Sequence, residues 1–222
     1  MDDPADIWTI DGSLNTLSDR PGMDSQKTNS YGIKVFHSFD GFEFQSFTSS
    51  TDTDVVFSYD ADWGNTDSHF PYVYDYFSET LRDRRSFNQE FRIVSDPADF
   101  LQDSFIEWVV GANYLELKES NFKKDDGLYG DPTDPFGPYA SASSSFSQSQ
   151  SSNISVFGNL DYLLSASLKF SIGLRVEDWE ANYSDSLKES FNPSDMMSGG
   201  KISLIKNMTN DTNMYASLAK GY

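Results

Sequence analysis

The chain has 222 residues, and its 35 Asp and Glu against 16 Lys and Arg give a formal charge of −19. This acidity argues against a nucleic-acid binder, because phosphate recognition needs a cationic surface. With no Cys and only two His (His37 and His69), the sequence excludes a disulfide framework, a thiolate metal site and a multi-histidine metal centre, and no cofactor is expected.

The beginning of the chain, MDDPAD, lacks the basic and apolar regions of a signal peptide. No stretch approaches the ~20 apolar residues of a membrane-spanning helix. Both facts fit a cytosolic protein, and both also fit an internal piece of a longer exported protein. The interior pattern has to distinguish these two interpretations.

Apolar and polar residues alternate with period two along the chain, which is typical of β-strands. The alternating segments are 87–93, 107–114, 154–162, 170–177, 201–204 and 214–219. In the clearest segment one face would carry Phe170, Ile172, Leu174 and Val176, and the other Ser171, Gly173, Arg175 and Glu177. The first set is expected to share a convex face with Ile154, Val156 and Leu160.

The expected connections alternate between short and long. The short ones are Phe39 to Phe42, Ser95 to Ser104, Leu164 to Ser167 and Lys206 to Asp211, and the long polar ones are Asp62 to Arg84, Ser120 to Ser145 and Ser184 to Gly199. Consecutive hairpins with tight turns at one end and long loops at the other are typical of outer-membrane barrels, whereas a soluble sandwich has shorter strands. The predicted fold class is therefore all-β: an antiparallel meander of long hairpins forming a partial arc of a large transmembrane β-barrel.

Charged residues in mid-strand are compatible with two interpretations. Glu90, Arg92, Arg175 and Glu177 would point to water in a soluble sandwich and into a wet lumen in a barrel, where they could pair across strands. Single positions leave this open, and the asymmetry of the connections favours the barrel. We then expect these four residues to share the concave face.

Aromatic residues are expected to form two interfacial girdles, although strands are rich in aromatics in general. Trp63 and Trp179 would lie toward the long loops, and Phe39, Phe42, Phe44, Phe100, Phe105 and Phe170 around the short turns. The serine-rich stretch 141–152 reads either as a flexible linker or, as we prefer, as a loop tip with the raised part of a strand.

Several stretches, taken together and in order, resemble one known family. They are FQSFT at 44–48, YDADW at 59–63, SFNQEFRIVS at 86–95, WVVGANY at 108–114, VFGNLDY at 156–162, SIGLRVE at 171–177 and MYASLAKGY at 214–222. The set resembles the barrel of TonB-dependent outer-membrane receptors. The resemblance implies that residues 1–222 are part of one barrel domain with about eight or nine strands, that 1–29 are mostly loop, and that the plug, the TonB-contacting box and the C-terminal strands are absent.

The resemblance also implies a function. Receptors of this family take up a scarce solute, often a ferric siderophore or similar metal chelate, by an energised process without covalent chemistry, so no enzyme activity is expected. The implied location is the bacterial outer membrane. The implied partners are outer-membrane lipid and lipopolysaccharide, a small-molecule metal chelate, and the TonB complex through the missing plug region, with no nucleic acid.

The long loop Asp62 to Arg84 is the candidate ligand site. It contains His69, Tyr72, Tyr74, Tyr76 and Arg82, and aromatic rings with Arg could hold an anionic chelate. The alternative is a packed loop whose Arg residues are neutralised by nearby acids or touch lipopolysaccharide. The acidic runs 125–126 and 131–134 could bind calcium through oxygens, but they lack the spacing of a known calcium loop.

Three other readings of the whole chain remain. A complete small outer-membrane barrel with an adhesin or structural role requires closure within the chain, and a secreted acidic all-β binding domain requires a buried second sheet. A hydrolase requires a nucleophile, base and acid in a recognisable setting, and none is found. If the barrel arc is right, the strands near Tyr31 and Leu218 should not pair with each other.

Overall fold

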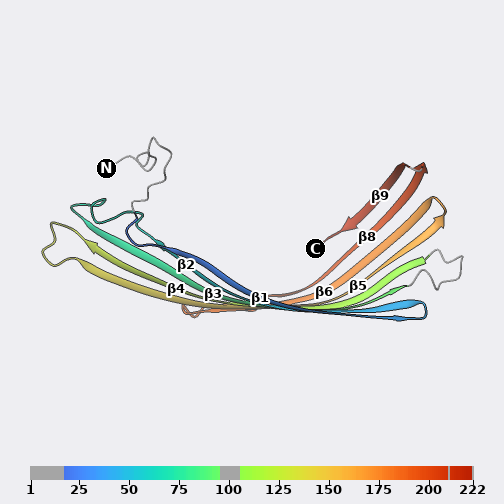
Figure 1. Ribbon diagram of the computed structural model, residues 1–222, viewed down its shortest axis with the longest axis horizontal. Helices are drawn as coiled ribbons and strands as arrows, with labels where there is room; N and C mark the ends of the chain where they lie inside the picture. Colours follow the sequence, from blue (N-terminus) through green and yellow to red (C-terminus); the bar gives the residue numbers. More distant parts are fainter. Residues whose placement is uncertain (1–17, 96–105, 210, 222) are drawn as a thin grey trace.

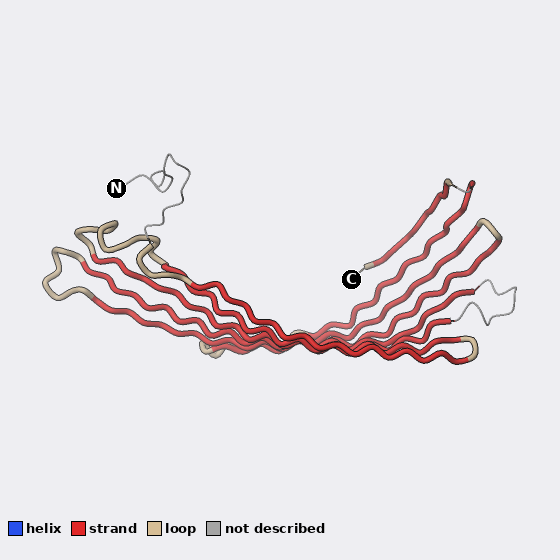
Figure 2. The backbone as a smooth tube through the Cα atoms, in the orientation of Figure 1, coloured by secondary structure: helices blue, strands red, loops and turns tan. Residues whose placement is uncertain are grey.

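The computed structural model describes residues 18–95, 106–209 and 211–221, and within these ranges the chain forms one antiparallel sheet without a helix (Figure 2). The strands are β1 (Met23–Phe39), β2 (Phe42–Asp60), β3 (Val73–Ser95), β4 (Ile106–Gly130), β5 (Tyr139–Ser165), β6 (Leu168–Asp185), β7 (Ser190–Phe191), β8 (Ser194–Thr209) and β9 (Thr212–Lys220). No helix in the described part of the chain is long and apolar enough to cross a membrane.

Neighbours in the sheet are also neighbours in the chain. The order is β1-β2-β3-β4-β5-β6-β8-β9, with the short β7 paired to β6, and every pairing is antiparallel. The predicted meander of long hairpins is therefore confirmed. In the described residues β1 and β9 are the two edges and do not pair with each other, as expected for the strands containing Tyr31 and Leu218.

The tight turns lie at one end of the curved sheet and the longer connections at the other (Figure 1). Asp40 and Gly41 join β1 to β2, and Gly41 adopts a positive φ of 81°, which a two-residue hairpin commonly requires. Ala166 and Ser167 are the two residues that join β5 to β6. We call this the turn end and the opposite one the loop end. Most of the predicted short link Ser95 to Ser104 lies outside the described residues.

The connections at the loop end are shorter than the sequence suggested. The region expected to be loop from Asp62 to Arg84 becomes strand at Val73, and most of Ser120 to Ser145 is strand. Ser184 to Gly199 likewise contains β7 and the start of β8. Polar residues on both faces made these stretches look like loops, but ladder hydrogen bonds use the backbone and continue regardless of side-chain polarity.

Two further stretches contain more strand than the sequence suggested. The strand β1 begins at Met23, so residues 23–29 are not loop. The serine-rich stretch 141–152 lies wholly within β5 and pairs with β4 on one side, which confirms the preferred reading as part of a strand, corrects the expected loop tip and excludes a flexible linker.

The pairing register fixes which residues share a face. Val156 pairs with Val176 and Leu160 with Ile172, so the apolar residues of β5 and β6 lie on one face as predicted. On the other face Arg92 lies opposite Gly111, Gly111 opposite Phe157, and Phe157 opposite Arg175. The next row on that face runs from Glu90 across Asn113 and Ser155 to Glu177.

Crowding identifies the concave side of the sheet. On the face that carries the charged residues, Ser155 is 1% and Glu177 6% exposed, whereas Leu174 and Ile154 on the apolar face are 62% and 59% exposed. Side chains converge inside a curve and splay apart outside it. The apolar face is therefore the convex one, as expected from the sequence.

The apolar convex residues form a band that runs diagonally across the strands. On β1 they extend from Tyr31 to Phe39, and on β6 from Leu168 to Val176. Val35, in the middle of the first run, lies in the same cross-strand row as Val176 at the top of the second. A level band therefore needs tilted strands, and barrel strands tilt by about 35–45°.

Three of the polar side chains that interrupt the band form hydrogen bonds with one another. The Thr48 hydroxyl donates to the Gln89 side-chain oxygen at 2.6 Å, and the Gln89 amide donates to the Ser46 hydroxyl at 3.1 Å. Such mutual bonding reduces the cost of polar groups next to hydrocarbon.

One of the two expected aromatic girdles contains the four predicted residues that the structure describes, Phe39, Phe42, Phe44 and Phe170. Near the turn end the convex face carries Phe39, Phe42, Phe44, Trp108, Tyr162 and Phe170, among which the Phe39 and Phe42 rings stack at 4.8 Å. Phe100 and Phe105 lie outside the described residues.

The second girdle was assigned to the wrong residues. Trp63 lies beyond β2, in the connection to β3, and Trp179 points to the concave face opposite Asn153. The upper edge of the band carries Tyr31, Phe87 and Tyr114 instead, with the latter two rings 6.2 Å apart.

A matched pair of substitutions tests the assignment of faces. Leu174→Arg puts a charge on the convex band and should lower the free energy of unfolding by about 2–4 kcal/mol in a bilayer. Leu115→Arg, on the concave face of β4, should lower the free energy of unfolding clearly less, because water can reach an Arg side chain at this position. Denaturant titration of the intact protein in phospholipid vesicles measures both, and equal losses would contradict the assignment.

Candidate functional site

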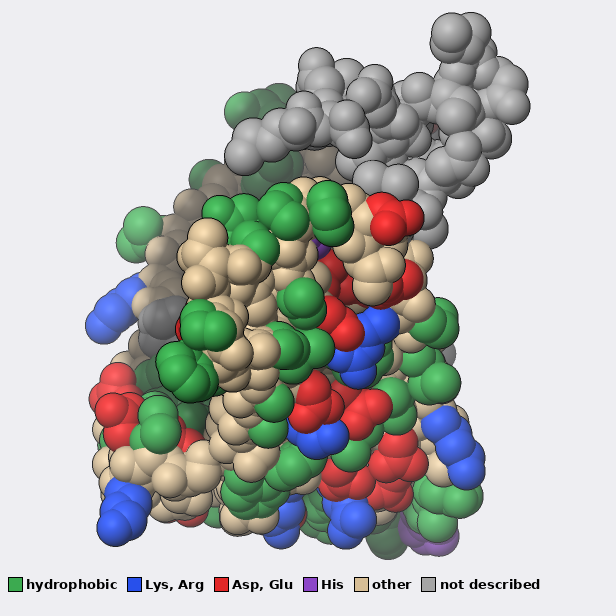
Figure 3. Space-filling model, turned by 90° about the vertical axis from the view of Figure 1, so that its left-hand side faces the viewer, with side chains coloured by type: hydrophobic (Ala, Val, Ile, Leu, Met, Phe, Trp, Pro, Cys, Tyr) green, Lys and Arg blue, Asp and Glu red, His purple; other side chains and the backbone are tan. Residues whose placement is uncertain are grey.

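The concave face of the loop end carries most of the predicted site. Tyr74, Tyr76, Arg82 and Arg84 are alternate residues of β3, so all four side chains project to the same side. They lie beyond the apolar band, toward the connections 61–72 and 131–138. Seen from this end, acidic and basic side chains lie intermixed with apolar ones (Figure 3).

Four rings gather at the top of this surface and form what we call the aromatic cluster. The Tyr74 ring centroid lies 4.7 Å from that of Tyr76, 5.2 Å from His69 and 6.5 Å from Tyr129. The contacts with His69 and Tyr129 are edge-on, a geometry that aromatic pairs favour. The cluster joins the 61–72 connection to two neighbouring strands.

Asp62 and Gly127 explain why the cluster forms here. The Asp62 carboxylate accepts hydrogen bonds from the backbone N–H of Tyr76 at 2.6 Å and of Gly64 at 2.9 Å, which holds the connection against β3. A side chain at position 127 would collide with the Tyr76 ring, so Gly127 provides the space that this ring occupies.

An ionic cluster lies next to the aromatic one, further along β3 and β4. The Arg84 Nε atom donates to Glu119 at 2.7 Å, and the Arg82 Nε atom donates to the Asn121 side-chain oxygen at 2.8 Å. The Asn121 amide in turn donates to Glu119 at 3.0 Å. Burial alone would raise the pKa of Glu119, but the Asn121 hydrogen bond and the two guanidinium charges outweigh it and lower the pKa below its ordinary value.

Serine hydroxyls continue this surface onto β5. Every odd-numbered residue from Ser141 to Ser151 is Ser, and all six project to the concave face. Ser149 lies opposite Glu119, and Ser147 opposite Asn121. The concave face at the loop end thus combines rings, guanidinium groups and small hydroxyls, which together can bind an anionic solute with aromatic and polar parts.

The structure brings together only part of the predicted ligand set. His69, Tyr74 and Tyr76 meet in the aromatic cluster, and Arg82 lies beside it in the ionic cluster. Tyr72 lies in the connection, where its N–H donates to the His69 carbonyl at 2.8 Å. The expectation that the whole set lies in one loop is wrong for Tyr74, Tyr76 and Arg82, which are strand residues.

Sequence reasoning missed Tyr129, Glu119, Asn121 and the serine row. Each is placed by the pairing of β4 with β3 or β5, and no local pattern fixes that register. The signal that was available is the presence of Ser at every odd-numbered position from 141 to 151, which indicates a strand with one uniform face.

The acidic runs do not converge on a calcium site. Asp125 projects to the concave face and accepts from Ser78 at 2.7 Å, while Asp126 projects to the convex face and pairs with Lys124 at 2.9 Å. Asp131 accepts the backbone N–H and the hydroxyl of Thr133, which lowers the pKa of its carboxyl group. The described part of the chain holds no group of three or more acidic or His side chains suited to a metal ion.

Comparison with known families identifies the chain. The family described as "TonB dependent receptor-like, beta-barrel" matches residues 3–222. The chain belongs to this family. It is a family of transport receptors and not of enzymes. No curated protein matches the sequence.

Solved receptors share the fold. The chain is similar to the ferric yersiniabactin uptake receptor FyuA from Yersinia pestis (15% identity, TM-score 0.59), with 86% of this chain and 27% of that one covered. It is similar to the ferric citrate transporter FecA (15% identity, TM-score 0.54, 86% and 26% covered). The siderophore receptor PiuA from Acinetobacter baumannii gives 14% identity and a TM-score of 0.60, with 89% and 32% covered.

These matches span about a quarter to a third of the length of the solved receptors. Within that span the sheet corresponds to an arc of a receptor barrel.

Proposed function

We propose that the protein is a bacterial outer-membrane receptor for the energised uptake of a metal chelate, a ferric siderophore or a similar compound. The observation that carries the proposal is the pair of clusters on the concave face at the loop end of a TonB-dependent receptor barrel. The relatives support the choice of solute class, because the three solved receptors are described as a ferric yersiniabactin uptake receptor, a ferric citrate transporter and a siderophore receptor.

The chemistry of the surface suits an anionic chelate. The rings of Tyr74, Tyr76 and Tyr129 offer flat faces for stacking, and guanidinium groups donate paired hydrogen bonds to carboxylate or catecholate oxygens. Glu119 already binds Arg84 and lies near Arg82, so the solute must compete with it. That competition favours a solute that presents several oxygens at once.

The other partners follow from the same proposal. The convex band contacts outer-membrane lipid, and energy reaches the receptor from the TonB complex through the plug region. Uptake moves the solute without breaking covalent bonds, so the proposal assigns no catalytic residue. Residues 1–222 then belong to one barrel domain.

The alternatives are less well supported. A small closed barrel needs paired edges, and β1 and β9 do not pair in the described residues. A soluble binding domain needs a covered apolar face, yet no hydrophobic side chain is buried anywhere in the part of the chain that the structure describes.

Replacing two cluster rings tests the binding surface. In the intact protein, Tyr74→Ala with Tyr76→Ala should weaken chelate binding by about 1–3 kcal/mol, because buried aromatic anchors carry much of the binding energy. Tyr72→Ala is the matched control and should have a smaller effect, since Tyr72 lies outside the cluster. Binding of radiolabelled ferric citrate, a ferric catecholate and a ferric hydroxamate to whole cells is the measurement.

Heat-modifiable migration on a gel should show normal barrel assembly for both variants, because these positions lie beyond the apolar band. Unchanged binding of every chelate by the double variant would contradict a role for the aromatic cluster.

Energised uptake is tested separately. Iron-limited cells that produce the intact protein should accumulate iron from at least one of the three chelates, and a protonophore should stop accumulation while leaving surface binding intact. Accumulation that continues in the presence of the protonophore, or that does not depend on the protein, would overturn the proposal.

A further inference from the structure

The aromatic cluster stands on a part of β3 that has a strand partner on one side only. The strand β2 ends opposite Phe77, so residues 73–76 pair with β4 alone. On the side of β2, the Ala61 N–H donates to the Tyr76 carbonyl at 2.8 Å, and the Tyr76 N–H donates to the Asp62 carboxylate. A backbone with so few partners opens easily, so the rings that it carries need support from another part of the chain.

Arg20 supplies that support from the opposite face of the strand. Its guanidinium carbon lies 4.5 Å from the centroid of the Phe77 ring, and one of its terminal N–H groups donates to the Asp75 carboxylate at 3.1 Å. Asp75 and Phe77 are the two chain neighbours of Tyr76, and they project to the convex side, whereas the Tyr76 ring projects to the concave side. One side chain therefore holds β3 on both sides of Tyr76.

The residue before Arg20 supports a second ring of the cluster. The Asp19 N–H donates to the Gly64 carbonyl at 3.2 Å. Gly64 is buried, and a side chain at this position would collide with the His69 ring. The hydrogen bond from Asp19 therefore fixes the backbone against which His69 packs.

We infer that Arg20 is a positioning residue for the aromatic cluster and that it acts through Asp75 and Phe77. The inference rests on the proposed function in so far as the cluster binds the chelate. Arg20 lies on the convex side, so it acts without touching the solute. Rings that are already held in place do not have to be ordered when the solute binds, and this raises the affinity.

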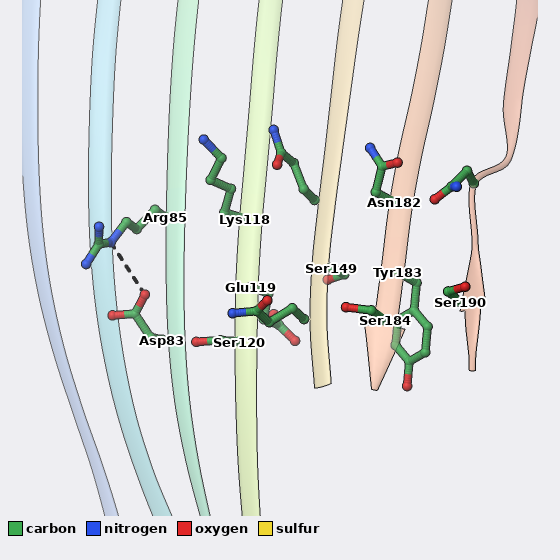
Figure 4. Close-up of a pocket in the computed structure, with 13 residues that line it drawn as sticks. Asp83, Arg85, Lys118, Glu119, Ser120, Ser149, Asn182, Tyr183, Ser184 and Ser190 are labelled. Carbon is green, nitrogen blue, oxygen red and sulfur yellow. Dashed lines mark ion pairs between the residues drawn. The ribbon is translucent and has the colours of Figure 1, made fainter. Parts of the chain in front are cut away.

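Arg85 offers a matched control. It forms an ion pair with Asp83 on the same convex face of β3, with its Nε atom 3.4 Å from the carboxylate (Figure 4). At this level β3 is paired with β2 on one side and with β4 on the other, and the Arg85 side chain is 66% exposed against 36% for Arg20. Removal of Arg85 should therefore leave the aromatic cluster in place.

Chelate uptake by whole cells is the first test, with ferric citrate, a ferric catecholate and a ferric hydroxamate as probes. For a chelate that the unaltered protein transports, Arg20→Ala should raise the concentration for half-maximal uptake roughly fivefold and leave the maximal rate unchanged. A loss of assembled receptor would lower the maximal rate instead. Arg20→Lys keeps the ion pair and should recover part of the loss, and Arg85→Ala should have no effect.

A double substitution tests the route through the ion pair. Asp75→Asn alone should raise the half-maximal concentration by less than Arg20→Ala does, because the contact of Arg20 with Phe77 remains. The two substitutions together should be no worse than Arg20→Ala alone, because Asp75 has then already lost its partner.

Hydrogen exchange gives a readout that needs no chelate. In the intact protein purified in mild detergent, the backbone amides of residues 73–77 should exchange roughly fivefold faster in Arg20→Ala than in the unaltered protein, because the lost contacts oppose local opening. Arg85→Ala should leave the exchange of these residues unchanged. Heat-modifiable migration verifies that each variant is assembled.

Unchanged exchange of residues 73–77 in Arg20→Ala would overturn the inference. So would an unchanged half-maximal concentration, or additive losses in the Arg20 and Asp75 double variant. Faster exchange in a protein that transports none of the three chelates would support the positioning role and contradict the uptake proposal, so the two failures are distinguishable.

Discussion

The sheet depends on a covering that its own described residues do not supply. None of their hydrophobic side chains is buried, and the sheet is a single layer with a broad, mostly apolar band on its convex face. Burial of apolar surface is the main favourable term in folding, so this face must be covered from outside. Hydrocarbon is the covering that fits, because it also explains why each strand pairs with its chain neighbour and leaves few backbone groups unpaired.

The need to cover the apolar face also explains why each strand has one part that serves the fold and another part that can bind a solute. Within the band the convex side must be apolar, and the concave side holds ion pairs such as that between Arg175 and Glu177. Beyond the band the strands β3 to β5 carry mostly polar residues on both faces, with one apolar row on the convex side that consists of Val56, Leu81, Phe122 and Phe146. The concave side of this extension holds the aromatic and ionic clusters.

The sequence predicted the features that depend on local pattern. The alternation at 170–177 gave the correct faces, and the turn at Asp40 and Gly41 was recognisable from its residues. The strand part of the serine-rich stretch 141–152 was expected, but the extensions of β3 and β4 were not, because stretches with polar residues on both faces lack the alternation that indicates a strand. Tyr74 and Tyr76 were chosen for their ring chemistry, but Tyr129 could be found only from the register between β3 and β4. Trp179 was assigned to the girdle because it lies near the end of a strand, although the alternation at 170–177, continued to 179, places it on the concave face.

The central claim is that one face of this sheet lies in lipid and the other in the barrel interior. This chain has no Cys, so single cysteines introduced at each position from 170 to 177 of β6 can each carry one fluorophore in an intact protein from which any Cys outside these 222 residues has been removed. In vesicles of brominated lipid, fluorescence should be quenched strongly at positions 170, 172, 174 and 176 and weakly at the positions between them. Uniform quenching, or stronger quenching at the odd positions, would contradict the account.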